Sequence, residues 1–144
     1  MSLETLSRMI GIWTGSGEMN DGSRKGDIHE YLEIKHSDIN DCLSYERKLR
    51  IDYPTESVLH NEIGYVTHEM FNIMTSLGGY LPLKWNSVSE RYCQMYESSF
   101  IKGISRKVVF PNSAMMIWDS RSKIINGRDW VTHNAYVEFF LVSR

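Results

Sequence analysis

Two histidines occupy positions where an imidazole could take part in binding or catalysis. His133 lies in the segment 130–142, where Val131 and Ala135 share its alternating face. This face is the more apolar of the two, so we expect His133 to point into the interior and Asn134 to point out. A register shift of one residue would exchange the two side chains. A neutral imidazole is a good metal ligand, and the alternative role for His133 is a hydrogen-bonded histidine in a polar-lined cavity.

His60 is the second candidate, because it shares a strand face with Glu62 and with the valines at positions 58 and 66. A histidine beside a carboxylate can orient a polar ligand or move a proton as an acid and base. The same two side chains can instead have a structural role, in which they tie their strand to its neighbour. In either role the pair is expected to face the interior.

Arg47 lies on the face of segment 42–51 that also carries Tyr45 and apolar residues. The opposite register would turn three charged side chains inward, so Arg47 is predicted to face the interior. A buried guanidinium needs a carboxylate close by. That carboxylate can belong to a ligand held by Arg47 and Tyr45, or to the protein, in which case Glu62 or Glu30 is the partner.

Aromatic and methionine side chains are frequent in the expected strands, and such side chains can pack against a flat apolar ligand. We expect Met74 and Trp85 to contact a bound cofactor and Phe139 to contact a bound ligand. For each of them the alternative is an ordinary place in the core. Trp13 is expected to plug one end of the fold, which is a structural role.

Strands must position these side chains, and from Gly11 onward short alternating segments are separated by turn residues. Residues 3–10 are expected to form a helix. About ten strands at this spacing favour an all-β fold, an antiparallel up-and-down barrel that closes to remove its edges and encloses a cavity. Gly64 is predicted to form a bulge or a bend, and Gly78-Gly79 a hairpin turn. Beyond the Gly-rich opening, the expected strands cover 27–35, 42–51, 58–67, 70–77, 80–85, 91–100, 105–110, 114–120 and 130–142.

Length and charge narrow the class of protein further. The chain has 144 residues, which favours one domain over 1–144, and its formal net charge of -2 gives no electrostatic reason to expect nucleic acid. No apolar run reaches the roughly 18 residues of a membrane-spanning helix, so no membrane partner is expected. Two cysteines, Cys42 and Cys93, favour a reduced cytoplasmic location. The expected partner is a small hydrophobic ligand. If the protein forms an oligomer, we expect a homodimer.

Three motifs occur in a characteristic order: Gly-x-Trp in Gly11–Gly17, Leu-x-Tyr with a following basic residue in Cys42–Arg47, and Leu-His-x-Glu-x-Gly-Tyr in Val58–Val66. Together they resemble the nitrobindin family of THAP-type haem-binding β-barrels. The resemblance implies a compact ten-stranded barrel, similar in shape to lipocalins and fatty-acid-binding proteins. It also implies haem b as a cofactor with His133 as its iron ligand, and the family's nitric oxide and peroxynitrite chemistry where haem is bound.

The sequence departs from that family between Met19 and Gly26, where it lacks the Tyr-Pro-Thr segment that helps to form the haem pocket. Three functions therefore stay open. The first is haem binding, with peroxynitrite isomerase activity if haem is bound. The second is a haem-free carrier or sensor of the fatty-acid-binding type, in which Arg47 and Tyr45 hold a ligand carboxylate. The third is a non-haem enzyme that uses His60 and Glu62.

Overall fold

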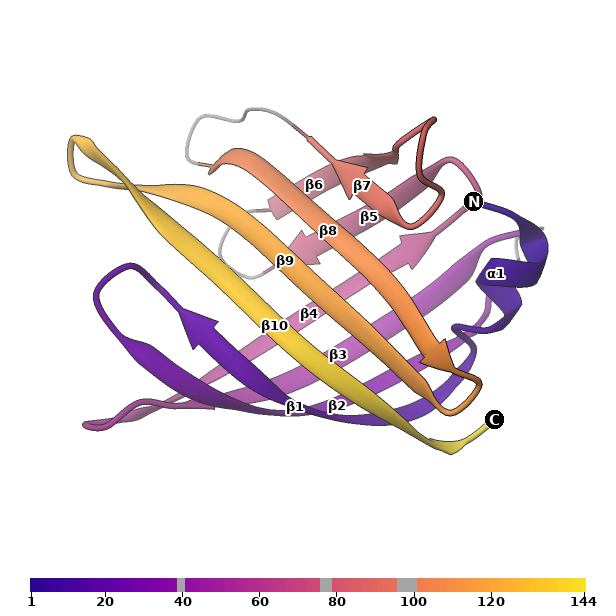
Figure 1. Cartoon of the computed structure of the whole chain (residues 1–144), viewed down its shortest axis with the longest axis horizontal. Helices are drawn as coiled ribbons and strands as arrows, with labels where there is room; N and C mark the ends of the chain where they lie inside the picture. Colours follow the sequence, from indigo (N-terminus) through magenta and orange to yellow (C-terminus); the bar gives the residue numbers. More distant parts are fainter. Residues whose placement is uncertain (39–40, 76–78, 96–100) are drawn as a thin grey trace.

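The computed structural model describes residues 1–38, 41–75, 79–95 and 101–144, apart from the side chains at 102 and 126. Within them, a short helix precedes ten antiparallel strands that close into a barrel, with β1 paired to β10 (Figure 1). The expected all-β barrel with an N-terminal helix is therefore confirmed. The elements are α1 (Leu3–Ser7), β1 (Gly11–Asn20), β2 (Lys25–His36), β3 (Leu43–Asp52), β4 (Ser57–Val66), β5 (Met70–Thr75), β6 (Gly79–Trp85), β7 (Tyr92–Gln94), β8 (Ile101–Asn112), β9 (Met115–Asn126) and β10 (Asp129–Ser143).

Strict alternation of buried and exposed residues explains why β2 and β3 form barrel strands. Every second residue is buried from Ile28 to Ile34 in β2 and from Leu43 to Ile51 in β3. Successive side chains of a strand point to opposite faces, so one set fills the barrel while the other faces solvent. The same period of two, read from the sequence, predicted these strands to within a few residues.

Two strands are longer than expected, because β8 and β9 continue their pairing past irregular positions. The expected strands 105–110 and 114–120 extend to Ile101–Asn112 and Met115–Asn126, and their register shifts between Lys102 and Ser105. Gly103 lies inside that shift with a φ of 62°, a conformation that glycine adopts without strain. Of the expected strand 91–100, the structure describes β7 at Tyr92–Gln94, while residues 96–100 lie outside the described part.

Gly64 does not form the predicted bulge, since β4 pairs with β3 in unbroken register from Ser57 to Val66. The physical reason for glycine is close approach. A β-carbon at Gly64 would overlap the Asn72 carbonyl oxygen and would lie 2.6 Å from the Tyr45 ring. The glycine is therefore needed because the Tyr45 ring and the neighbouring backbone come close, and it does not kink the strand. The predicted Gly78-Gly79 turn falls partly on residues 76–78, outside the described part.

The barrel has two distinct ends. At the helix end, α1 covers the opening, and Trp13 is fully buried with its indole Nε1 donating to the Met9 carbonyl at 2.9 Å. At the hairpin end, on the left of Figure 1, the turns of β1–β2, β3–β4 and β9–β10 lie together. Trp13 thus sits at the closed end, where the sequence places it.

Five aromatic side chains, which we call the aromatic cluster, pack the barrel between Trp13 and its middle. Phe71 and Phe139 each lie 5.2 Å from Trp118 between ring centroids, and Tyr45 lies 5.4 Å from Phe71, all in edge-to-face arrangements. Such contacts add to the free energy of burying the rings. The helix half of the barrel is therefore a packed core, formed by Tyr45, Phe71, Trp85, Trp118 and Phe139.

Candidate functional site

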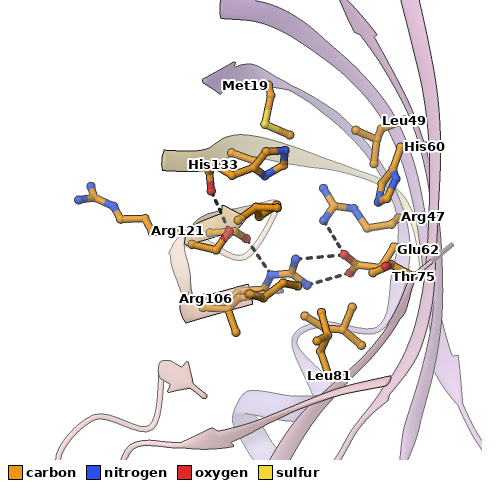
Figure 2. A pocket seen from close by; sticks show the side chains of 17 residues that line it. Met19, Arg47, Leu49, His60, Glu62, Thr75, Leu81, Arg106, Arg121 and His133 are labelled. Atoms are coloured by element: carbon orange, nitrogen blue, oxygen red, sulfur yellow. Dashed lines mark hydrogen bonds and ion pairs between the residues drawn. The ribbon is translucent and has the colours of Figure 1, made fainter. Parts of the chain in front are cut away.

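A cavity of about 400 Å³ occupies the barrel interior toward the hairpin end (Figure 2). Its volume falls within the range of roughly 300–1,000 Å³ typical of small-molecule sites. Isoleucine and leucine side chains form much of its wall, and a few polar groups point into it. The lining residues are Met19, Arg47, Leu49, His60, Glu62, Ile73, Thr75, Leu81, Ile101, Ile104, Arg106, Ser120, Arg121, Ser122, Ile124, His133 and Ala135.

Four charged side chains, which we call the ionic layer, span the middle of the barrel: Glu30, Arg47, Glu62 and Arg106. Arg47 donates to both Glu30 carboxylate oxygens, from Nε at 2.6 Å and from Nη2 at 2.5 Å. Arg106 donates to both oxygens of Glu62, from Nη1 at 2.8 Å and from Nη2 at 3.2 Å. A longer contact of 3.5 Å from Arg47 Nη1 to Glu62 joins the two pairs. The layer thus holds two buried ion pairs, each a two-pronged contact between an arginine and a glutamate.

Neighbouring side chains fix this layer in place. The Tyr45 hydroxyl donates to Glu62 at 2.7 Å, and Arg106 Nε donates to the Ser120 hydroxyl at 2.8 Å. The guanidinium carbons of Arg106 and Arg47 lie 4.9 Å and 5.3 Å from the centroid of the Trp118 ring. Trp118 is a favourable neighbour for these cations, because the face of an aromatic ring is electron-rich. The layer therefore rests on the aromatic cluster and forms the floor of the cavity.

Burial and pairing shift the acidities of the layer in different directions. Burial raises the pKa of Glu30 above its usual value, although Arg47 opposes this. For Glu62 burial acts in the same sense, but Arg106 and Arg47 outweigh it and hold the pKa at about 2. The carboxylates in turn raise the pKa of Arg47 despite its burial. Glu62 is consequently a buried carboxylate that stays ionised at neutral pH.

His60 and His133 project into the cavity from the walls formed by β4 and β10 (Figure 2). Desolvation lowers the pKa of both imidazoles below the usual value, and Glu62 partly opposes this for His60. Both rings are therefore neutral at physiological pH, the form in which imidazole binds metals. The Ser122 hydroxyl donates to the His133 carbonyl at 3.0 Å, which secures the backbone of β10 beside β9.

The sequence-predicted site residues separate into two groups in the structure. His133, His60, Arg47 and Glu62 line the cavity. In the register of β10, His133 shares the inward face with Ala135 and with the buried Val137 and Phe139, as expected.

The other predicted residues lie elsewhere. Tyr45, Trp85 and Phe139 are buried in the aromatic cluster beneath the ionic layer. Met74 is 38% exposed and pairs with Ile63, whose side chain is also exposed, on the outer surface. Met74 thus differs from the sequence expectation of a cavity residue, because its place in β5 turns its side chain outward.

Arg106 is a site residue that sequence reasoning missed, although it is 4% exposed and lines the cavity. The sequence does contain a signal for it, because Arg106 shares its strand face with Ile104, Val108 and Phe110. A single charged residue on an otherwise apolar strand face is the pattern that identified Arg47. Glu30, between Ile28 and Leu32, shows the same pattern and appeared only as a partner for Arg47.

Comparison with known proteins adds three findings. The profile of the THAP4-like, heme-binding beta-barrel domain matches residues 2–86, more than half of the chain. Among solved structures, the S-type phycobiliprotein lyase CPES from Guillardia theta is similar, with a TM-score of 0.66 and 10% sequence identity over 98% of this chain and 93% of that one. At that identity the likeness concerns the fold alone. A search of curated proteins finds no match.

Proposed function

The chain belongs to the family of THAP4-like, heme-binding β-barrel domains, and on that premise we propose that its cavity binds haem b with the His133 imidazole as iron ligand. The observation that carries the proposal is the position of His133, a neutral imidazole that projects from β10 into a largely apolar cavity. Haem iron is commonly held by one histidine, and bound haem supplies an open iron site for small ligands.

The cavity wall suits a flat, apolar macrocycle. Ile73, Leu81, Ile101, Ile104 and Ile124 present aliphatic side chains, which favour transfer of an apolar ring out of water. Met19 lines the cavity at the start of the segment in which this chain lacks the family's Tyr-Pro-Thr motif. A flexible thioether adapts to the outline of a bound ring, so Met19 can supply contact area there.

His60 faces the same cavity from another wall, two residues before the ionic Glu62. Its lowered pKa keeps it neutral, so it can donate or accept a hydrogen bond without bringing a charge into the cavity. We assign His60 to the surroundings of the bound group rather than to the iron, and the variants below separate the two histidines.

Titration of the purified protein with hemin tests the proposal. The wild-type protein is expected to develop a Soret band typical of histidine-ligated iron. His133→Ala should shift that band and weaken hemin binding by at least about tenfold, the loss of one coordinate bond. Asn134→Ala is the matched control, because it changes the next residue on the opposite strand face and should leave the band unchanged.

His60→Ala is expected to keep the histidine-type Soret band. Absence of a hemin-induced band in the wild-type protein would contradict the proposal. So would a band that is indifferent to His133→Ala, or one that is lost in His60→Ala but kept in His133→Ala.

A further inference from the structure

The ionic layer presents polar atoms to the cavity that the proposed iron ligation does not use. Arg47, Glu62 and Arg106 line the cavity floor, and each is 4% exposed. Buried charges are costly unless they are paired, and here both arginines are paired within the protein. The floor therefore has a defined charge and a defined set of donors, which together restrict what a ligand can place against it.

Each guanidinium has five N–H groups, and the contacts of the described residues account for three of them. Arg47 uses three in its contacts with Glu30 and Glu62. Arg106 uses three in its contacts with Glu62 and Ser120. Two N–H groups of each guanidinium stay outside these contacts, and both arginines line the cavity, so a ligand oxygen there can accept a hydrogen bond from a cation.

The charge of the layer is balanced before any ligand arrives. Glu30 accepts two N–H groups of Arg47, one on each oxygen, as an ionised carboxylate does. Glu62 accepts the fork of Arg106 in the same way. Two positive and two negative charges cancel. A ligand carboxylate would add an unbalanced buried negative charge next to Glu62, which is unfavourable in a medium of low dielectric constant.

We infer that the floor of the cavity accepts a neutral hydrogen-bond acceptor of the ligand, such as a carbonyl oxygen, and discriminates against a carboxylate. The inference rests on the proposed function only in taking this cavity as the ligand site, and it does not require iron. It differs from capture of a fatty-acid carboxylate by Arg47 and Tyr45, because Glu30 and Glu62 already balance the charge of Arg47, and Glu62 accepts the only hydroxyl hydrogen of Tyr45. A charged group of any ligand is then directed toward the hairpin end.

A matched pair of probes tests the inference on the protein without added hemin. The neutral ketone 6-propionyl-2-dimethylaminonaphthalene and the acid 6-dimethylamino-2-naphthoic acid share one naphthalene body and differ in the group offered to the floor. The ketone is expected to bind at least about tenfold more tightly at pH 7.5. Its emission should also report a hydrogen bond to the carbonyl, and Arg106→Gln should weaken that signal.

Glu30→Gln provides the sharpest variant, since Glu30 pairs with Arg47 but is not among the residues that line the cavity. The substitution removes one negative charge from the layer without changing the surface that a ligand meets. The naphthoate should gain at least about tenfold in affinity while the ketone changes little. Glu46→Gln, an exposed position on β3 paired with Lys48, is the matched control and should change neither affinity.

Equal or tighter binding of the acid by the wild-type protein would overturn the inference, as would failure to bind either probe. An unchanged acid-to-ketone ratio in a folded Glu30→Gln protein would overturn it too. If that variant does not fold, the acid-to-ketone affinity ratio of the wild-type protein and the ketone emission in Arg106→Gln still test the inference. A protein that prefers the ketone but does not bind hemin would support this inference and contradict the iron proposal. A protein that binds hemin through His133 but does not prefer the ketone would support the iron proposal and contradict this inference.

Discussion

The two halves of the barrel share one backbone pattern and differ in what their inward side chains do. Along β9 the inward residues change from the buried Trp118 at the helix half to Ser120 and Ser122 at the hairpin half. Along β10 they change from Phe139 to Ala135 in the same direction. The pairing of β9 with β10 continues without interruption from one half to the other. The change from a packed core to a cavity therefore comes from the smaller inward side chains and not from the backbone.

The ionic layer makes that change abrupt. Its charged groups lie at the level where the aromatic cluster ends, and their pairing within the protein gives the cavity a polar floor. We therefore expect the helix half to carry most of the stability and the hairpin half to carry binding. Substitutions on either side of the layer test this division.

The largest effect is expected in the aromatic cluster. Phe71→Ala should lower the free energy of unfolding by about 3–5 kcal/mol, since it leaves a void among Tyr45, Trp85 and Trp118. Ile124→Ala, in the half-buried cavity wall, should cost less than about 1 kcal/mol. Urea denaturation of both variants measures the difference. Equal losses would remove the distinction between a packed half and an open half.

Breaking the ionic layer should come next in size. Glu62→Gln leaves Arg106 without its carboxylate and should lower the free energy of unfolding by about 3 kcal/mol. Denaturation at pH 7 measures this loss, with the exposed Glu46→Gln as control. A near-neutral Glu62→Gln would mean that the floor is not held by ion pairing.

Acid should weaken the layer with a predictable sign. The folded-state pKa of Glu62 is about 2 and its ordinary value is 4.5, so its contribution is present above pH 4.5 and is lost as the pH falls toward 2. We expect a loss of about 3 kcal/mol from this group over that window. Glu30 opposes the trend, because its raised pKa favours proton uptake by the folded state.

Denaturation of the wild-type protein and of Glu62→Gln at several pH values between 5 and 2 isolates this contribution. The difference in stability between the two proteins should shrink steadily as the pH falls. A difference that stays constant, or grows toward acid, would contradict a carboxylate held ionised by Arg106 and Arg47.

The smallest effect is expected for an ion pair of similar length outside the barrel. Arg24 contacts Glu56 at 2.7 Å, but the two side chains are 38% and 54% exposed. Water screens this pair, so Glu56→Gln should change the free energy of unfolding by no more than about 0.5 kcal/mol. A loss comparable to that of Glu62→Gln would show that burial does not set the strength of these contacts.

Strand alternation was enough to predict the barrel and the inward direction of His133, His60 and Arg47. The same alternation carries Tyr45 and Phe139 inward, yet these two lie below the ionic layer and outside the cavity lining. The position of an inward side chain along the barrel axis depends on the stagger between neighbouring strands. The alternation within one strand gives no information about that stagger.

Met74 illustrates a second limit. In β5 the two faces carry Phe71 with Ile73 and Asn72 with Met74, and methionine is apolar enough to be assigned to either face. The pairing of β5 with β4 and β6 places Met74 beside Ile63 and Tyr80 on the outer surface. Arg106, in contrast, could have been found by applying to β8 the argument that identified Arg47.

A crystal structure of the hemin complex, with the iron located by anomalous scattering, tests the central claim most directly. We predict iron bonded to the His133 imidazole on the hairpin side of the ionic layer, with Trp118, Phe71 and Phe139 in their present positions. Iron bound through another side chain would contradict the account, and so would a ligand that displaces the aromatic cluster below Arg47 and Arg106.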